Sequence, residues 1–397
     1  MLARPKRAVA VSVGTVPDAR SDVDIREARD LFPVTRTTSY FNTATVGLAS
    51  RILLAAYREC IDEWENVGLD YVRGEVAGEH ARAAVARLIG ASPADVAQIA
   101  SVSAAAGLVA AQLGPAGAVQ NVVIGEREYS SNHFPWRQLA HKGYEVRQVP
   151  FRSGGIEPDL VASLVDGGTV LVAFSAVQTA TGHRSDIAAI SDIARAVGAI
   201  VFVDGSQLVG ALPVAAELDA IDVLATADHK FLMHAGRGMG YCYLAPGVRD
   251  RFVPVNAGWK AGRVPVESFF GPEMDLSPTA SRFDNSISWV AAIGNEAALS
   301  TFDDLGAGPV FTRNRELAEA LWGALSDIGW HPLEFPAANR STIVAVPLGG
   351  ENGSRLVEQL RQRGVAVAMR DGNLRLSVHV YNHEDDIARL VRALTEL

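Results

Sequence analysis

The chain has 397 residues and a net charge of -9, with 48% hydrophobic and 20% charged residues. This length predicts two packed lobes, and the composition is typical of a globular α/β enzyme and not of a disordered chain. The negative charge argues against nucleic acid as a partner, and no apolar run approaches the roughly 18 residues of a membrane helix. The two cysteines, Cys60 and Cys242, lack the spacing of a metal site or a disulfide framework, so we expect no metal and a cytoplasmic location.

The first 36 residues are predicted to form an N-terminal arm. Arg4, Lys6 and Arg7 precede a short Ala/Val run that weakly resembles a signal peptide. Ser12 and Gly14 interrupt that run and no convincing cleavage site follows, so a mobile arm is the preferred interpretation.

Small hydroxyl side chains precede an Ala-rich helix start in the next part of the chain. After helical patterns over residues 52–65 and 79–89, residues 98–103 lead into Ala104 and its neighbours. The free N–H groups of such a start, with the Ser103 hydroxyl, form an anion site. The commoner alternative is that a serine simply caps the helix.

Three apolar runs, at residues 121–124, 169–174 and 199–203, are predicted to be buried strands. The first is followed by Tyr129, which is either a loop aromatic or a ring that covers a flat cofactor, and the second is followed by Gln178. Asp186 is predicted to cap a helix over 187–197, between the second strand and the third. This βαβ alternation predicts a parallel, doubly wound sheet.

The stretch from residue 199 to 230 brings together the residues with the most informative chemistry. Its first strand ends at Asp204, with Gln207 three residues on, and a second strand over 221–225 leads to His229 and Lys230. Ligands bind outside the carboxyl ends of parallel strands. A lysine that forms a Schiff base and an Asp that keeps a pyridine nitrogen protonated are what a protein contributes to pyridoxal phosphate (PLP) chemistry. Taken alone, the stretch also fits a turn Asp and a surface His-Lys pair.

The C-terminal part is predicted to be a second α/β lobe. A Gly-rich turn at 236–240 leads into a strand, which is not a dinucleotide fingerprint, and residues 259–281 form a long loop predicted to belong to the active site. A helix over 289–302 follows. Helices at 314–328, 354–363 and 384–397 then alternate with strands at 341–346, 365–368 and 374–378. We place the large domain at 37–290 and the small domain at 291–397.

Together these residues resemble the aminotransferase class V family, the fold-type I PLP enzymes that include cysteine desulfurases, kynureninases and isopenicillin N epimerase-like proteins. The resemblance runs from about Tyr40 to the C-terminus. It implies a large, doubly wound, mainly parallel sheet domain and a smaller C-terminal α/β domain. It also implies that PLP is the cofactor and a small amino acid the substrate.

The resemblance assigns the catalytic roles to Lys230, Asp204 and Tyr129. Lys230 would hold PLP and move protons at Cα, Asp204 would pair with the pyridine nitrogen, and Tyr129 would stack where many relatives have a His. The other cofactor contacts it implies are Gln178 and Gln207 at the ring edge, and Ser103, the Ala104 N–H and His229 at the phosphate.

The resemblance also implies substrate and subunit contacts. Arg375, in Leu374-Arg375-Leu376-Ser377, would grip the α-carboxylate. Asn42 would line the substrate side, and Arg370 would meet a second acidic group. Ser286, or Ser288, would reach the phosphate of the neighbouring subunit, which implies a homodimer with shared active sites.

One difference from the family reduces the number of reactions that fit the chain. Cysteine desulfurases carry a nucleophilic Cys upstream of the carboxylate arginine, whereas residues 364–375 contain none. This disfavours a persulfide-forming desulfurase. An aminotransferase-type reaction is preferred; a Cβ–S lyase acting on a cysteine- or cystine-type substrate and an amino-acid epimerase are the alternatives, with kynureninase-like hydrolysis also open. A non-catalytic PLP-fold protein and a nucleotide-dependent oxidoreductase are remote alternatives.

Overall fold

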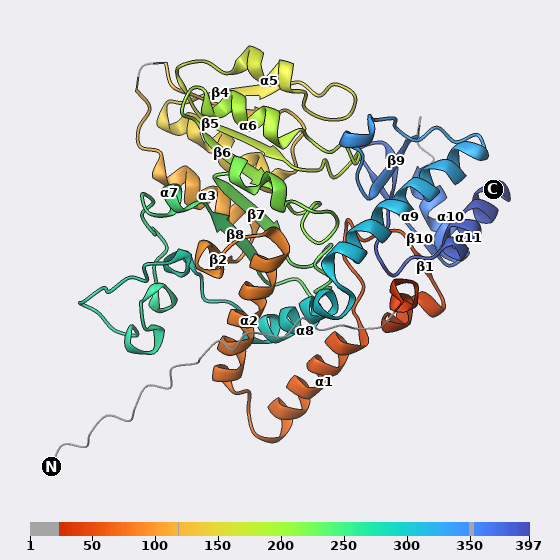
Figure 1. Cartoon of the computed structure of the whole chain (residues 1–397), viewed down its shortest axis with the longest axis horizontal. Helices are drawn as coiled ribbons and strands as arrows, with labels where there is room; N and C mark the ends of the chain where they lie inside the picture. The colour runs from red at the N-terminus through yellow and green to blue at the C-terminus, as the bar shows by residue number, and fades with distance from the viewer. Residues whose placement is uncertain (1–23, 118, 349–352) are drawn as a thin grey trace.

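A seven-stranded sheet forms the centre of the large domain. The computed structural model describes residues 24–117, 119–348 and 353–397, so the first 23 residues of the predicted arm lie outside it. The strand order is β2-β8-β7-β6-β5-β3-β4, and β8 alone runs antiparallel to the rest (Figure 1). The expected mainly parallel sheet is therefore confirmed. Its strands are β2 (Val96–Ile99), β3 (Asn121–Gly125), β4 (Glu145–Val149), β5 (Thr169–Ser175), β6 (Ile200–Asp204), β7 (Val223–Ala227) and β8 (Gly240–Leu244).

Helices cover both faces of this sheet because its buried strands present apolar side chains to both sides. Phe202 and Leu171 pack with residues of α3 and α4, whereas Val201 and Val203 pack into a second core with residues of α2, α6 and α8. The large-domain helices are α1 (Arg51–Asn66), α2 (Tyr71–Ile89), α3 (Val102–Gln112), α4 (Phe134–Arg137), α5 (Pro158–Leu164), α6 (Ile187–Arg195), α7 (Pro246–Arg249) and α8 (Trp289–Leu305).

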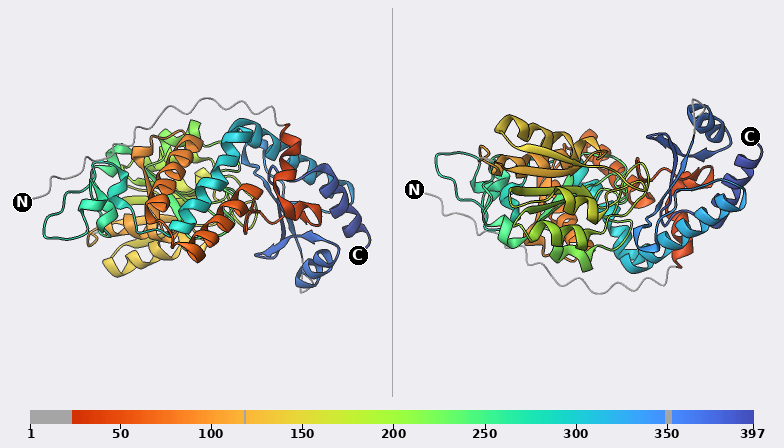
Figure 2. Two further views of the ribbon diagram at one scale, coloured as in Figure 1. Left: turned by 90° about the horizontal axis from the view of Figure 1, so that it is seen from below. Right: turned by 90° about the horizontal axis from the view of Figure 1, so that it is seen from above.

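The small domain lies at one end of the molecule and has its own core (Figure 2). Its antiparallel sheet has the order β11-β12-β9, and a short parallel pair joins β1 to β10. The elements are β1 (Ser39–Tyr40), β9 (Ile343–Pro347), β10 (Val365–Ala366), β11 (Ala368–Arg370), β12 (Asn373–Ser377), α9 (Ala307–Asp327), α10 (Gly353–Gln362) and α11 (Glu384–Thr395).

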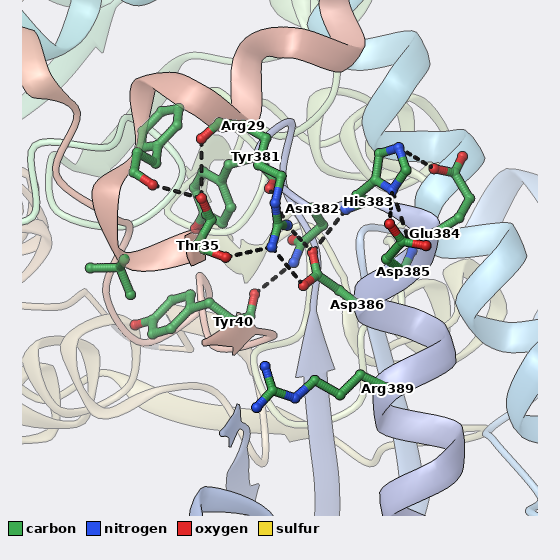
Figure 3. A network of polar contacts seen from close by, with 12 residues as sticks. Arg29, Thr35, Tyr40, Tyr381, Asn382, His383, Glu384, Asp385, Asp386 and Arg389 are labelled. Carbon is green, nitrogen blue, oxygen red and sulfur yellow. Dashed lines mark hydrogen bonds and ion pairs between the residues drawn. The ribbon is translucent and has the colours of Figure 1, made fainter. Parts of the chain in front are cut away.

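Residues 24–40 contact the small domain although they begin the described chain (Figure 3). Arg29 forms an ion pair with Asp386, whose carboxylate also accepts a hydrogen bond from the backbone N–H of His383 at 2.9 Å as part of the α11 capping box. The Asn382 Nδ2 donates to the Tyr40 carbonyl at 2.9 Å. The chain therefore passes along the small domain before it enters the large one. The boundary near residue 290 stays a prediction.

The carboxyl ends of β5, β6 and β7 lie side by side in the sheet, so the residues at these ends are neighbours. Ser175 pairs with Asp204 across β5 and β6, and Asp204 pairs with Ala225 across β6 and β7. On the small-domain side, Asn42 forms a bridge with Ser377 at the end of β12. The strand ends of the large domain and the end of β12 therefore meet at the seam between the two domains.

The long loop over 259–281 was predicted to belong to the active site. It contains only short helical turns, and it projects from the end of the large domain opposite the small domain (Figures 1 and 2). Phe270 is 89% exposed and Met274 is 72% exposed. The loop therefore lies away from the chain's own domain seam.

No helix among residues 24–117, 119–348 and 353–397 has both the length and the apolar character needed to cross a membrane. Across the same residues, His, Cys, Asp and Glu side chains nowhere form a group of three or more that would hold a metal ion.

Candidate active site

Lys230 follows β7 and points toward groups from both domains. Its Nζ lies 5.3 Å from the centre of the Tyr129 ring. Burial is the main reason why the pKa of Lys230 is lowered to about 8. The Asp204 charge acts against this shift, and the Arg375 charge contributes to it. The side chain remains partly exposed. A reachable amine that is largely neutral just above pH 8 is suited to covalent chemistry with a carbonyl group.

Two glutamines of the predicted site have buried polar atoms without a hydrogen-bond partner among the described residues. Asp204 ends β6, is buried, and accepts a hydrogen bond from the Ser206 N–H at 2.9 Å. Gln207 donates through Nε2 to Thr179 Oγ1 at 2.7 Å, but its Oε1 has no partner among the described residues. The Nε2 of Gln178 is likewise buried without a partner. Buried polar atoms are nearly always hydrogen-bonded, so these atoms indicate a polar ligand at this position.

Tyr129 and its neighbour Glu128 lie at the end of the loop that follows β3. The Tyr129 ring is half exposed and presents a face to the lysine. Glu128 is buried, and its carboxyl accepts hydrogen bonds from the N–H of Ser175, at 3.0 Å, and from the Ser175 hydroxyl. Burial is the main reason why the pKa of Glu128 is raised to about 7. The hydrogen bonds from Ser175 act against this shift, and the nearby Asp204 charge contributes to it. Sequence reasoning did not identify Glu128, although its position just past a strand end was a usable signal.

At the start of α3 the capping residue is Ser101. Its Oγ accepts a hydrogen bond from the Ala104 N–H at 3.2 Å, and it lies 2.9 Å from the Ser103 Oγ. Ser103 is exposed. The ordinary capping role thus belongs to Ser101, which leaves the Ser103 hydroxyl accessible, whereas an anion at the Ala104 N–H would have to replace the cap.

Arg375 is buried at the domain seam, and its hydrogen-bond partners among the described residues are neutral groups. Its Nη1 donates to the carbonyl and the hydroxyl of Thr179, both at 3.0 Å, and its Nη2 donates to Thr45 Oγ1. Arg370 donates to the same Thr45 oxygen at 3.2 Å, and Asn42 accepts the Thr45 hydroxyl proton at 2.6 Å. Burial, with a smaller contribution from the Arg370 charge, lowers the pKa of Arg375 to about 9. Thr45 and Thr179 were not identified from the sequence.

Ser286 and Ser288 have different surroundings. The Ser288 Oγ caps α8 by accepting a hydrogen bond from the Ala291 N–H at 3.3 Å. Ser286 is exposed, and the segment before it is held by the buried ion pair of Arg82 with Asp284. Within the described part of the chain, neither serine is hydrogen-bonded to Lys230, so the structure does not bring them to this site of the same chain.

His229 also lies next to the lysine, as predicted, and its Nδ1 lies 3.3 Å from Asp228 Oδ1. The structure thus brings Lys230, Asp204 and Tyr129 near Arg375, Arg370 and Asn42, whose substrate contacts stay a prediction. A cavity of about 330 Å³ lies elsewhere, between α9 and β9, and none of the predicted site residues lines it.

The sequence model of the family described as Aminotransferase class-V matches residues 72–390. The chain belongs to the aminotransferase class V family. It is therefore a PLP-dependent enzyme, as the resemblance implied.

Relatives of this class V chain span different reactions. It is 25% identical over 364 residues to an uncharacterized aminotransferase, YcbU, of Bacillus subtilis, covering 91% of this chain and 95% of the relative. It is 29% identical over 338 residues to isopenicillin N epimerase of Streptomyces clavuligerus, covering 80% and 83%. The solved structure of C-DES with glycine covalently linked to its PLP cofactor has a TM-score of 0.82 at 20% identity, covering 93% of this chain and 99% of that one. This likeness confirms the fold-type I architecture.

The residues of the class V chain fit PLP. The Lys230 amine would supply the covalent anchor, and the Asp204 carboxylate lies at the end of β6, beside β7. The unpartnered atoms of Gln178 and Gln207 supply polar contacts that a bound ring would complete.

Proposed function

We propose that the enzyme transaminates a small α-amino acid, with Lys230 as the residue that binds PLP and moves the Cα proton. The observation that carries this proposal is the Lys230 amine, whose Nζ lies 5.3 Å from the centre of the Tyr129 ring and whose pKa is lowered to about 8. Bound PLP supplies an electron sink for charge that develops at the substrate Cα. A lysine amine that is readily deprotonated is suited to take that proton.

The other cofactor contacts follow from the same arrangement. Asp204 would hold the pyridine nitrogen, and Tyr129 would cover one ring face. Gln178 and Gln207 would complete their unused hydrogen bonds at the ring edge. The phosphate would lie against His229, the Ser103 hydroxyl and the Ala104 N–H, at the start of α3 where the helix dipole favours an anion.

The substrate contacts are proposed from the charge of the domain seam. No acidic side chain among residues 24–117, 119–348 and 353–397 forms an ion pair with Arg375 or Arg370. A buried guanidinium without an anion is costly, and a carboxylate can bind it through two parallel hydrogen bonds. Arg375 would therefore bind the α-carboxylate beside Asn42. Arg370 would bind a second acidic group on the side chain of the substrate.

The absence of a nucleophilic cysteine at residues 364–375 supports a route without a persulfide on the protein. Cys60 and Cys242 are both buried, and burial raises the pKa of Cys242 to about 12. A thiol with so high a pKa is a poor nucleophile near neutral pH. The two free, buried thiols also fit the reducing cytoplasmic location that we propose.

We also propose a homodimer in which Ser286 reaches the phosphate of the second copy. Ser286 is exposed, and the loop over 259–281 that precedes it exposes Phe270 and Met274. Apolar side chains grouped in one loop favour burial against a partner. Ser288 is already used as the cap of α8, so Ser286 is the better of the two candidates.

The experiment is an absorbance spectrum of the purified holoenzyme followed by turnover with single amino acids. A visible band that borohydride removes, and that Lys230→Ala lacks, would support the lysine assignment. Formation of a keto acid would support transamination. Pyruvate with sulfide or a thiol would instead show C–S lysis, and racemised substrate without a keto acid would show epimerisation. Retention of the band by Lys230→Ala would overturn the proposal.

A further inference from the structure

Asp228 is a fully buried carboxylate two residues before Lys230. Its Oδ2 accepts hydrogen bonds from His234 Nδ1 at 2.8 Å, from the Met239 N–H at 3.1 Å and from Asn295 Nδ2 at 3.2 Å. Its Oδ1 lies 3.3 Å from His229 Nδ1. One side chain therefore links β7, the loop that follows it and α8.

The ionisation of Asp228 fixes the protons of both imidazoles. Burial acts to raise its pKa, but hydrogen bonds from His229 and His234 outweigh burial and hold the pKa at about 2. An ionised carboxylate can only accept hydrogen bonds. Each imidazole must therefore carry a proton on Nδ1, and Nε2 of His229 is the nitrogen available to a ligand. It donates to a phosphate oxygen when it carries a proton as well, in the imidazolium form.

The second imidazole extends this arrangement to α1. His234 is fully buried, and its Nε2 is hydrogen-bonded to the Tyr57 hydroxyl. With the His234 proton on Nδ1, the Tyr57 hydroxyl is the donor. A Cβ at Gly294 would lie 2.5 Å from the Tyr57 oxygen, so α8 needs a glycine there for the pair to fit.

The loop that Asp228 holds has an unfavourable backbone. Met233, Ala235 and Arg237 have φ values of 60°, 60° and 57°, in the left-handed region that residues with a Cβ rarely adopt. Such conformations persist only where surrounding contacts enforce them. The hydrogen bonds from His234 and the Met239 N–H to Asp228 tie the middle and the end of this loop to its start.

We propose that Asp228 is a positioning residue for the cofactor: it orients His229, at the start of the loop over 228–239, toward the phosphate. The proposal rests on the proposed roles of His229 and Lys230. Asp228 itself touches neither substrate nor cofactor and acts through the imidazole beside it. The hydrogen bond between Tyr57 and His234 holds the imidazole that donates to Asp228.

The test is the affinity of the apoenzyme for PLP, measured by titrating its absorbance band. Asp228→Asn keeps the shape of the side chain, but its amide nitrogen cannot accept a hydrogen bond, so one imidazole loses its partner. We expect PLP binding to weaken about 10- to 100-fold, the usual effect of losing a charged hydrogen bond. Tyr57→Phe removes only the outer contact and should change the affinity less than about 3-fold.

A double-mutant cycle separates positioning from a general loss of structure. If Asp228 acts through His229, then Asp228→Asn combined with His229→Asn should bind PLP no more weakly than His229→Asn alone. Additive losses, or an Asp228→Asn affinity within about 3-fold of the parent enzyme, would overturn the inference. If the visible band survives Lys230→Ala, it is the proposed function that fails instead.

A measurement on the unaltered holoenzyme covers the case in which Asp228→Asn does not fold. In ¹⁵N-histidine-labelled enzyme, the His229 signals, identified by their loss in His229→Asn, should show a proton on Nδ1. A His229 protonated on Nε2 alone would be incompatible with donation to Asp228 and would overturn the inference.

Discussion

The amine of Lys230 faces the ring of Tyr129, with 5.3 Å between Nζ and the ring centre. A cation this close to an aromatic face is stabilised by about 0.5–2 kcal/mol. The same ring is available to stack on a flat cofactor once the lysine is covalently bound. The Tyr129 ring therefore faces the lysine amine in the free enzyme and would stack on the cofactor ring in the proposed holoenzyme.

This dual role predicts different results for two substitutions at residue 129. Tyr129→Phe keeps the ring and should change PLP affinity less than about 3-fold. Tyr129→Ala removes about 1–3 kcal/mol of stacking and should weaken binding roughly 5- to 150-fold. Both values come from titrating the visible band. Equal losses in the two variants would show that the hydroxyl, and not the ring, is the important group.

The sequence predicted the ends of strands better than the contacts between distant segments. Asp204 and Lys230 were predictable because each follows an apolar run, and parallel strands end at one edge of a sheet. Thr45 and Thr179 were not predicted, because they meet Arg375 only once segments more than a hundred residues apart are packed together. No local pattern marks such a contact.

The start of helix α2 was also predicted incorrectly, although it depends on a local pattern. It begins at Tyr71, whereas the pattern predicted a start near residue 79. Gly74 and Gly78 weaken the helical pattern, because glycine is an unfavourable helix residue. A Cβ at Gly74 would lie 2.3 Å from the Trp289 Cβ, so glycine at this position allows α8 to approach. The tertiary contact outweighs the local propensity.

The lowered pKa of Lys230 predicts how PLP binding depends on pH. Below pH 8 the amine is mostly protonated and cannot attack a carbonyl, so the rate of covalent attachment should rise as pH rises through about 8. Arg370→Ala removes a charge that lowers this pKa, so the midpoint should move up. Asp204→Asn removes a charge that raises it, so the midpoint should move down. The rate at which the visible band appears, measured from pH 6 to 10, gives all three midpoints. A midpoint near 10.5 in the parent enzyme would contradict the assignment.

The raised pKa of Glu128 predicts that a neutral replacement stabilises the protein at alkaline pH. The pKa of the Glu128 carboxyl is near 4.5 in the unfolded chain and about 7 in the folded protein. Ionisation therefore destabilises the folded state, increasingly as pH rises from 4.5 to 7 and by the full amount above pH 7. Glu128→Gln lacks this destabilisation. Its free energy of unfolding relative to the parent should therefore increase by about 2–3 kcal/mol between pH 4.5 and pH 8. Urea denaturation of the apoenzyme at the two pH values measures this change. The same difference at both pH values would show that folding does not shift the pKa of Glu128.

The two arginines at Thr45 predict a separation in substrate kinetics. Arg375→Ala should lower kcat/KM for every α-amino acid that the enzyme accepts, because each substrate has an α-carboxylate. The loss should be about 2–4 kcal/mol, or roughly 30- to 1,000-fold. Arg370→Ala should produce a loss only for substrates with an acidic side chain, and it should leave neutral amino acids within about 3-fold.

Arg361→Ala is the matched control, because Arg361 is exposed on α10 and forms an ion pair with Glu358 of the same helix. Steady-state kinetics with one acidic and one neutral amino acid of similar length, for all three variants, distinguishes the two roles. An equal loss for both substrates in Arg370→Ala would show that the two guanidinium groups bind a single carboxylate. The substrate would then need only one acidic group, and Thr45 would serve to hold both arginines on it.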